Sequence, residues 1–277
     1  MTTAGRQHRR PVGELLRRWR DRRRLSQLEL TLESGISARH LSFVENGRSA
    51  PSRETVLRLA EELDLPLRER NDLLLAAGYA PVYSEAALDS PELASVRAAV
   101  RQVLRGHEPC PAVAVDRGWN LLDANSGVAL LTEGVAEELL APPANVLKAS
   151  LHPDGMAPRI LNLGEWRAHL LGRLRRQVAL TADPALSRLL AELRSYPSGG
   201  SEPEVEVPGP GDIVVPLRLR HGGRELSFFS TVTTFGTPLD VTVSELAIES
   251  FFPADTETAS VLRGLSDQGF AGGAGRP

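Results

Sequence analysis

The residues at positions 25–46 suit the recognition of DNA. Ser26 and Ser37 each precede a helical run, and a serine there can accept a hydrogen bond from an amide of the first turn. Gly35 separates the two runs, and Asn46-Gly47 closes the second. Two short helices joined through a glycine turn can place the second helix in the major groove. The spacing therefore predicts a helix-turn-helix.

The distribution of charge indicates that only the N-terminal part of the chain has a polyanionic partner. Residues 1–53 contain twelve arginines and five acidic residues, a net charge of +7, whereas residues 54–277 have a net charge of −10. A basic segment on an acidic chain indicates that only this segment binds nucleic acid. The arginine cluster between Arg20 and Arg24 also fits a solvated helix end, so charge by itself leaves both interpretations open.

The other reactive residues do not form a recognisable catalytic or metal-binding pattern. The six histidines lack the spacing of metal ligands, and Cys110 is the only cysteine. Nucleophile-elbow, Walker and dinucleotide-binding fingerprints are missing, and His221-Gly222-Gly223 is better explained as a hairpin turn than as an oxyanion loop. We therefore expect neither an enzyme nor a cofactor or metal ion.

The apolar runs indicate the compartment. The longest, such as residues 73–77, are far too short to span a membrane, and no hydrophobic segment follows the arginines near the N-terminus. A single cysteine fits a reducing environment. We expect a cytoplasmic protein with no membrane partner.

Helical spacing and capping residues predict five short helices within residues 12–80. They are a helix through Val12 and Trp19, one from Ser26 to Gly35, Ala38–Glu45, one opened by Pro51-Ser52 and reaching Leu63, and Leu67–Ala77. A connecting helix, Pro91–Gly106, carries a stripe of Val96, Val100, Val103 and Leu104.

The pattern changes beyond Pro109 and predicts a mixed α+β domain around one antiparallel sheet. The expected strands are Ala112–Asp116, Trp119–Ala124, Ile213–Arg220, Arg224–Phe235 and Leu239–Phe252. The last two alternate apolar with polar residues, with Val232, Val241, Val243, Leu246 and Ile248 on a buried face. Helices are expected at Glu165–Ala179, Pro184–Arg194 and Asp255–Leu265, and a loop at 196–211.

Several fixed spacings resemble the XRE-type family of the lambdoid phage repressors across residues 12–63. They are Leu25-Ser26-Gln27, Ser34-Gly35-Ile36-Ser37, Leu41, Val44-Glu45-Asn46-Gly47 and Pro51. The resemblance implies a lambda-repressor-like domain that binds a double-stranded DNA operator as a homodimer.

The resemblance also implies roles for individual residues. Gln27 matches the phosphate-binding glutamine, and Asn46 and Arg48 match positions that contact the DNA backbone. The base-reading face would consist of Ser37, Ala38, Arg39, His40, Ser42 and Phe43. Arg39 has the geometry for a bidentate contact to guanine, and Ala38 for apolar contact with a thymine methyl. Three alternatives remain open: Ser37 as only a cap, His40 as simply exposed, and Phe43 packed against the protein.

Arg20 and Glu45 match positions that form an ion pair between the first and third helices in that family. We favour this structural role over direct contact with DNA. Removing one partner of a buried pair strands a charge, which costs several kcal/mol.

A longer resemblance, over roughly residues 10–265, is to the MmyB-like branch of the same family. Its marks are the run from Leu73 to Pro81, Val115-Asp116-Arg117-Gly118-Trp119-Asn120, Asn125, Leu151-His152-Pro153-Asp154-Gly155, Trp166-Arg167, Ser227-Phe228-Phe229-Ser230 and Phe235-Gly236-Thr237-Pro238. It implies a PAS-like ligand-binding domain, with a five-stranded antiparallel sheet flanked by helices, that senses a small apolar molecule such as a fatty acid.

Candidate ligand-binding residues are His152, Arg159, Trp119 and Trp166. His152 and Arg159 could meet a carboxylate, although a turn at residues 152–155 is the favoured interpretation. The two tryptophans fit a core position better than ligand stacking.

The expected organisation is a DNA-binding domain at 1–81, a linker and connecting helix at 82–108, a PAS-like domain at 109–265 and a disordered tail at 266–277. A second functional hypothesis keeps DNA binding but gives the C-terminal domain only dimerisation or protein-partner binding, since a closed PAS-like core needs no ligand.

Overall fold

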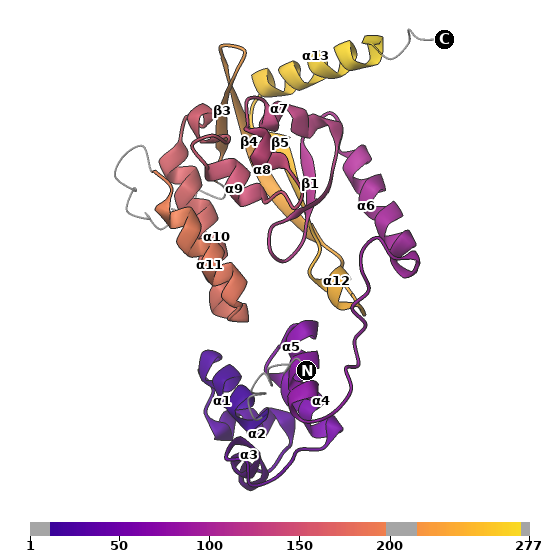
Figure 1. Ribbon diagram of the computed structural model, residues 1–277, viewed down its shortest axis with the longest axis vertical. Coiled ribbons are helices and arrows are strands. Elements are labelled where there is room, and N and C mark those ends of the chain that lie inside the picture. The colour runs from indigo at the N-terminus through magenta and orange to yellow at the C-terminus, as the bar shows by residue number, and fades with distance from the viewer. Residues whose placement is uncertain (1–11, 198–214, 273–277) are drawn as a thin grey trace, which may run out of the picture. The chain divides into compact units, whose positions relative to one another are not determined.

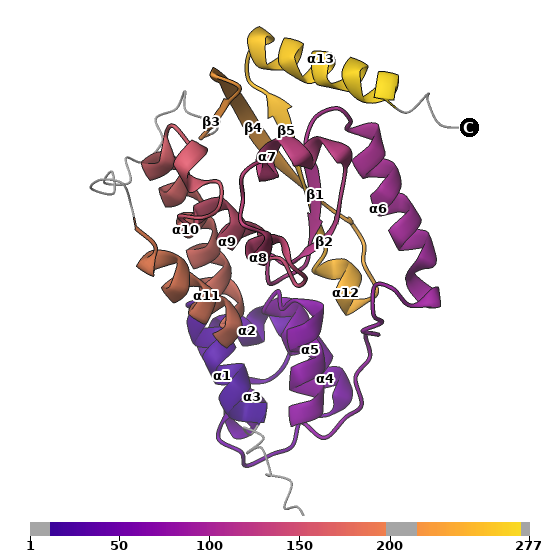
Figure 2. The same cartoon turned by 45° about the horizontal axis from the view of Figure 1, so that its top comes forward.

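The computed structural model describes residues 12–197 and 215–272, which form two compact units. The first unit contains the described residues up to Ala86 together with Thr237–Ser244. The second contains Ala87–Gly236 and the chain from Glu245 onward. Figures 1 and 2 label the elements of both units.

The first unit contains the five predicted helices. Their bounds are Val12–Arg22 (α1), Gln27–Ser34 (α2), Ala38–Glu45 (α3), Arg53–Glu62 (α4) and Leu67–Ala76 (α5). The Ser26 hydroxyl accepts from the Glu29 amide at 3.2 Å, and the Glu29 carboxylate accepts from the Ser26 amide at 2.7 Å. These reciprocal bonds satisfy exposed donors at the start of α2 and confirm the expected cap.

One apolar core joins the five helices. Its fully buried members include Leu16, Leu30, Leu41, Val56, Leu59 and Leu73. Helix α1 approaches the end of α3 closely, because a Cβ atom on Gly13 would lie 2.1 Å from the Val44 carbonyl oxygen. Only glycine allows this approach, and it brings the side chains of α1 beside Glu45.

Glu45 links three helices of the first unit. Its side chain is fully buried, and its carboxylate accepts from Arg20 Nε at 2.7 Å and Arg20 Nη2 at 3.1 Å. Gln27 Nε2 donates to the same carboxylate at 2.7 Å. Burial acts to raise the pKa of Glu45, but the bonds from Arg20 and Gln27 outweigh it and lower the pKa. The buried charge is therefore compensated from α1 and α2.

The second unit is built on a five-stranded antiparallel sheet, as predicted. The strands are Ala112–Val115 (β1), Leu121–Ala124 (β2), Leu217–His221 (β3), Arg224–Thr234 (β4) and Ala247–Pro253 (β5), in the order β2-β1-β5-β4-β3. Gly222 and Gly223, at φ 55° and 77°, form the two-residue turn between β3 and β4. This turn confirms the expected hairpin.

Both faces of β1, which lies between β2 and the central strand β5, are covered. Ala112 and Ala114 pack with Val100 and Leu104 of α6 (Ala94–Gly106), which follows a short 3-10 turn at Pro91–Leu93. Val113 and Val115 of the same strand face the opposite core, because successive strand residues point to opposite faces of a sheet. Figures 1 and 2 show α6 on one side of the sheet and α9 to α11 on the other.

The helices on that second face are partly those expected. The predicted pair is present as α10 (Leu163–Thr181) and α11 (Pro184–Ser195). Short elements that the sequence analysis missed fill residues 126–159: Ser126–Val128 (η2), Ala129–Thr132 (α7), Glu137–Leu140 (α8), Val146–Leu151 (α9) and Ala157–Arg159 (η3). Each is too short to show helical periodicity in the sequence.

The expected strand Leu239–Phe252 was wrong over its first half. Residues 241–244 form a single helical turn, α12 (Val241–Ser244), and β5 starts only at Ala247. The Asp240 carboxylate accepts from the Val243 amide at 3.3 Å, and the Val241 amide donates to the Ser84 carbonyl at 2.8 Å. These tertiary bonds override the period-two pattern.

Three smaller expectations also need correction. Val232 is exposed rather than buried, because β4 continues beyond its pairing with β3, which ends at Phe228. Val103 is exposed and does not belong to the buried stripe of α6. The last helix, α13 (Thr256–Gly272), continues past Leu265 into the segment expected to be disordered. Residues 198–214, which include most of the expected loop and the first two residues of the expected strand Ile213–Arg220, lie outside the described residues, as do residues 273–277.

Replacing Arg20 with methionine would leave the Glu45 carboxylate buried without its main partner. We expect the Arg20→Met variant to lose about 3–5 kcal/mol of unfolding free energy in the first unit. The measurement is hydrogen exchange of the α1–α3 amides in the full chain. Because the pKa of Glu45 is lowered, the pair stabilises fully above the ordinary carboxyl pKa and less as pH falls through the lowered value. The loss of unfolding free energy caused by Arg20→Met should therefore become smaller in acid.

The matched control is Arg58→Met, which removes the exposed pair of Arg58 with Glu54 on α4. Exposed ion pairs contribute little to the free energy of unfolding, so amide hydrogen exchange of α1–α3 should hardly change in this variant. Equal changes in both variants would contradict a special role for the buried carboxylate.

Candidate nucleic-acid interface and ligand pocket

Helix α3 presents an open surface at its N-terminal end. Ser37, Ala38 and Arg39 are exposed, and His40 is half-buried. The Ser37 hydroxyl accepts from the His40 amide at 3.2 Å, so Ser37 caps the helix. The buried side of the same helix carries Leu41, which anchors it to the core. The base-facing candidates thus lie on the solvent side of a fixed helix.

One turn further along α3, Phe43 supports Arg39. The guanidinium carbon of Arg39 lies 5.3 Å from the centre of the Phe43 ring, within the range of a cation–π contact. Phe43 and Ser42 are both half-buried. The ring therefore helps to orient a guanidinium that remains exposed.

Around this face lie amide side chains held by intramolecular bonds. Gln27 is half-buried and its Nε2 donates to Glu45. Asn46 Nδ2 donates to the Ser42 carbonyl at 2.8 Å, and its Oδ1 accepts from Arg17 at 3.0 Å. Arg17 Nε also donates to the Glu45 carboxylate at 3.5 Å, so Gln27 and Asn46 belong to one network with that carboxylate, while Arg48 is exposed.

The chemistry available here suits a phosphate backbone and base edges. The N-termini of α2 and α3 carry exposed amides and a partial positive charge, which attract anions. Arg39 and Arg48 add full positive charges next to neutral hydrogen-bonding groups. An oriented guanidinium on a capped helix can discriminate a guanine by about 1–3 kcal/mol.

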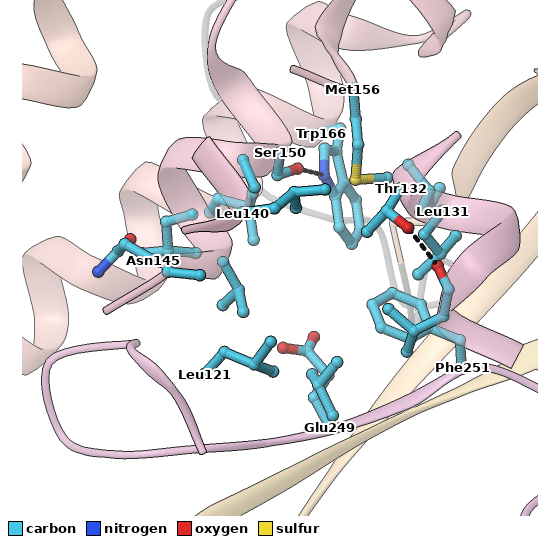
Figure 3. A pocket seen from close by; sticks show the side chains of 18 residues that line it. Leu121, Leu131, Thr132, Leu140, Asn145, Ser150, Met156, Trp166, Glu249 and Phe251 are labelled. Carbon is cyan, nitrogen blue, oxygen red and sulfur yellow. Dashed lines mark hydrogen bonds between the residues drawn. The ribbon is translucent and has the colours of Figure 1, made fainter. Parts of the chain in front are cut away.

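The second unit contains an apolar cavity of about 80 Å³ between the sheet and α7–α10. Figure 3 shows the side chains around it. The sheet contributes Val113, Leu121, Leu217, Glu249 and Phe251. The helices and loops contribute Val128, Leu131, Thr132, Leu140, Ala144, Asn145, Val146, Leu147, Ala149, Ser150, Met156, Trp166 and Leu170. The helix-covered sheet is thus not packed solid.

Of the four candidate ligand residues, Trp166 lines the cavity. It is buried, and its indole N–H donates to the Ser150 hydroxyl at 3.0 Å (Figure 3). Trp119 lies outside the lining, where its indole N–H donates to Gln177 at 2.8 Å and Arg173 stacks on its ring at 4.7 Å. Both indoles are therefore held by bonds within the protein.

His152 and Arg159 also lie outside the lining of this cavity. Arg159 donates to the carbonyl oxygens of Leu130, Leu131, Glu133 and Arg220 at 2.7–3.2 Å. These bonds connect the end of α7 to the edge strand β3. His152 follows α9, where its ring packs edge-on against Tyr196 with centroids 4.9 Å apart.

The sequence analysis missed Glu249, the one acidic residue that lines the cavity among the residues described. Its side chain is 7% exposed, and Oε1 accepts from Arg173 and from Ser230, each at 2.9 Å. The sequence offered one signal for Glu249, because it is an isolated acidic residue in the apolar run from Ala247 to Phe252. A strand with one solvated face would have explained an acidic residue at this position equally well.

Two further features concern the described part of the chain. No group of three His, Cys, Asp or Glu side chains there could hold a metal ion. None of its helices combines the length and apolarity that a membrane crossing requires.

Comparison with known proteins gives the same two parts. Residues 16–70 match a helix-turn-helix family model, and residues 96–265 match the model of the MmyB-like transcription regulator ligand binding domain. The chain is 40% identical over 75 residues to the HTH-type transcriptional repressor RghR of Bacillus subtilis, and 35% identical over 83 residues to the uncharacterized HTH-type transcriptional regulator RghRB. These alignments cover 27% and 30% of the chain.

The chain spans only about half the length of these curated relatives, 53% and 58%. Among solved structures, the restriction-modification controller protein C.AhdI from Aeromonas hydrophila is 36% identical. That match covers 21% of this chain and 89% of the controller, with a TM-score of 0.21.

The helix-turn-helix model makes the first unit a DNA-binding domain of a transcription regulator. The ligand-binding model covers more than half of the chain and coincides with the cavity-bearing sheet and its helices. The chain therefore belongs to the family of transcription regulators that carry the MmyB-like ligand-binding domain.

Proposed function

We propose that this regulator binds a near-palindromic operator in the cytoplasm as a homodimer, and that a small apolar ligand of its C-terminal domain controls that binding. The observation that carries the proposal is an apolar cavity inside the domain that matches the ligand-binding model. The proposed limits are 1–81 for DNA binding and 109–265 for sensing.

The DNA-binding part of the proposal rests on α3. The exposed side chains at its N-terminal end would enter the major groove, with Gln27, Asn46 and Arg48 on the phosphates. Two copies related by a twofold axis would place their α3 helices about 34 Å apart. An operator with two half-sites one helical turn apart follows from this arrangement.

The apolar lining supports a ligand with a hydrocarbon chain like that of a fatty acid. The cavity volume of about 80 Å³ is smaller than the roughly 150 Å³ cavity that accommodates benzene in another protein. A short or branched chain fits most easily, and a longer chain would need α7–α9 to move outward. Such a movement would give the ligand an effect on the rest of the domain.

Chain connectivity offers a route from the cavity to the DNA-binding unit. Strands β4 and β5 belong to the sensing unit, whereas the connection between them, Thr237–Ser244, belongs to the first unit. Within that unit Asp240 accepts from the Ser84 hydroxyl at 2.7 Å and the Ala86 amide at 3.1 Å. β5 then carries Glu249 and Phe251 into the cavity wall. A shift of β5 would therefore pull on a segment held in the DNA-binding unit.

Replacing Arg39 with alanine tests the base-reading role. We expect relaxed preference at one base position of each half-site and a loss of about 1–3 kcal/mol on the selected operator. The measurement is binding to a randomised DNA pool, followed by titration of the selected sequence and of random DNA. Equal losses on both DNAs would sink the assignment, and Arg58→Ala on α4 is the control outside the proposed interface.

Replacing Gln27 with alanine should weaken all DNA sequences about evenly, because a phosphate contact carries no sequence information. Since Gln27 also donates to the buried Glu45, hydrogen exchange of α1–α3 must accompany the DNA titrations. A changed base preference with unchanged exchange would contradict the phosphate role.

A double-mutant cycle tests the connection through Asp240. Ala149→Leu fills the cavity and should change operator affinity by about fivefold or more, a typical coupling between sites. Adding Asp240→Ala, which removes the acceptor for Ser84 and Ala86, should abolish most of that change. Additive effects of the two substitutions would exclude this route, and Val103→Ala on the exposed side of α6 is the control.

A further inference from the structure

The cavity wall carries a carboxylate where an acidic ligand would need a cation. Glu249 projects from β5 into the space beside Leu121 (Figure 3). Both bonds to its carboxylate, from Arg173 and Ser230, go to Oε1. Within the described residues Oε2 receives no hydrogen bond. It is a free acceptor on an otherwise apolar wall.

Each of the other polar side chains of the lining has at least one hydrogen-bond partner within the protein. The Asn145 amide donates to the Gly118 carbonyl at 2.8 Å and accepts from the Lys148 amide at 3.2 Å. Thr132 donates to the Val128 carbonyl at 3.2 Å, and the Ser150 hydroxyl accepts from Trp166. A ligand that enters the cavity therefore meets one unused strong acceptor, Oε2 of Glu249.

The described residues place no basic side chain in the lining. Arg173 is not part of the lining. Its guanidinium stacks on the Trp119 ring and forms an ion pair with the Glu249 carboxylate. Arg159 is bonded to four backbone carbonyls outside the cavity. A carboxylate ligand would therefore be buried in an apolar cavity without a cation to pair with it, which is unfavourable.

We propose that the sensing cavity selects an apolar ligand whose polar end is a neutral hydrogen-bond donor, such as an alcohol, and that Glu249 Oε2 accepts that bond. The inference rests on the proposed sensing function and names the chemistry of the ligand's polar end. Arg173 already balances the charge of Glu249, so a cationic amine finds no unpaired carboxylate there. A free acid of the same carbon skeleton is disfavoured because its carboxylate would be buried without a cation of its own.

The test compares three probes of matched length on the full chain by isothermal titration calorimetry. They are a primary alcohol, the corresponding carboxylic acid and a methyl ether that can accept but not donate, in four-, six- and ten-carbon series. We expect the alcohol to bind at least about tenfold more tightly than the acid and several-fold more tightly than the ether. Ala149→Leu, which fills the cavity, should abolish binding of all three.

Glu249→Gln removes the negative charge while nearly preserving shape, and it should narrow the preference for alcohol over acid. If this variant folds poorly, the titrations of the wild-type chain with alcohol, acid and ether still test the inference. An acid that binds as tightly as its alcohol would overturn the assigned polar end and leave sensing of an apolar ligand intact. Absence of binding by every probe would overturn both the inference and the sensing function.

Discussion

The buried carboxylate of Glu45 is the interaction on which the geometry of the DNA-binding unit depends. A carboxylate can remain buried only if partners replace its hydration, and Arg20 and Gln27 do so from two other helices. Because the three side chains meet at one point, the relative positions of α1, α2 and α3 are tightly constrained. The close approach at Gly13 adds a steric constraint at the same crossing.

This arrangement has a direct consequence for DNA recognition. Gln27, which compensates the buried charge from α2, is also the residue proposed to contact a DNA phosphate. The end of α3 that carries Glu45 continues into Asn46, whose amide is held by Arg17 and the Ser42 carbonyl. Stability and the orientation of the exposed face thus share one network, and Arg39 projects from the opposite end of the same helix.

In the sensing unit, the governing constraint is the coverage of both faces of β1 and β5. Small alanines on one face admit α6 closely, while larger residues on the other face meet α7–α11. The short helices of residues 126–160 do not close that second core fully, and the space that remains is the cavity. The sheet contributes Glu249 to its wall, so a packing surface also becomes a site with one acidic group.

Local signals in the sequence determined much of this protein. Ser26 with Glu29, Gly35, Ser37 and the Gly222-Gly223 turn act within a few residues, so the helix boundaries and the hairpin could be predicted. The five-stranded antiparallel sheet also followed from the pattern and the resemblance, whereas the order of its strands did not.

Tertiary structure alone decided the rest. The alternating valines at 241 and 243 indicated a strand, but bonds from Asp240 and Ser84, far apart in sequence, turned that segment into a helical turn. Glu249 became a cavity residue because β5 lies between β1 and β4 inside the sheet and the helices α7–α10 cover the face from which its side chain projects. Such outcomes depend on contacts between distant residues, which no local periodicity records.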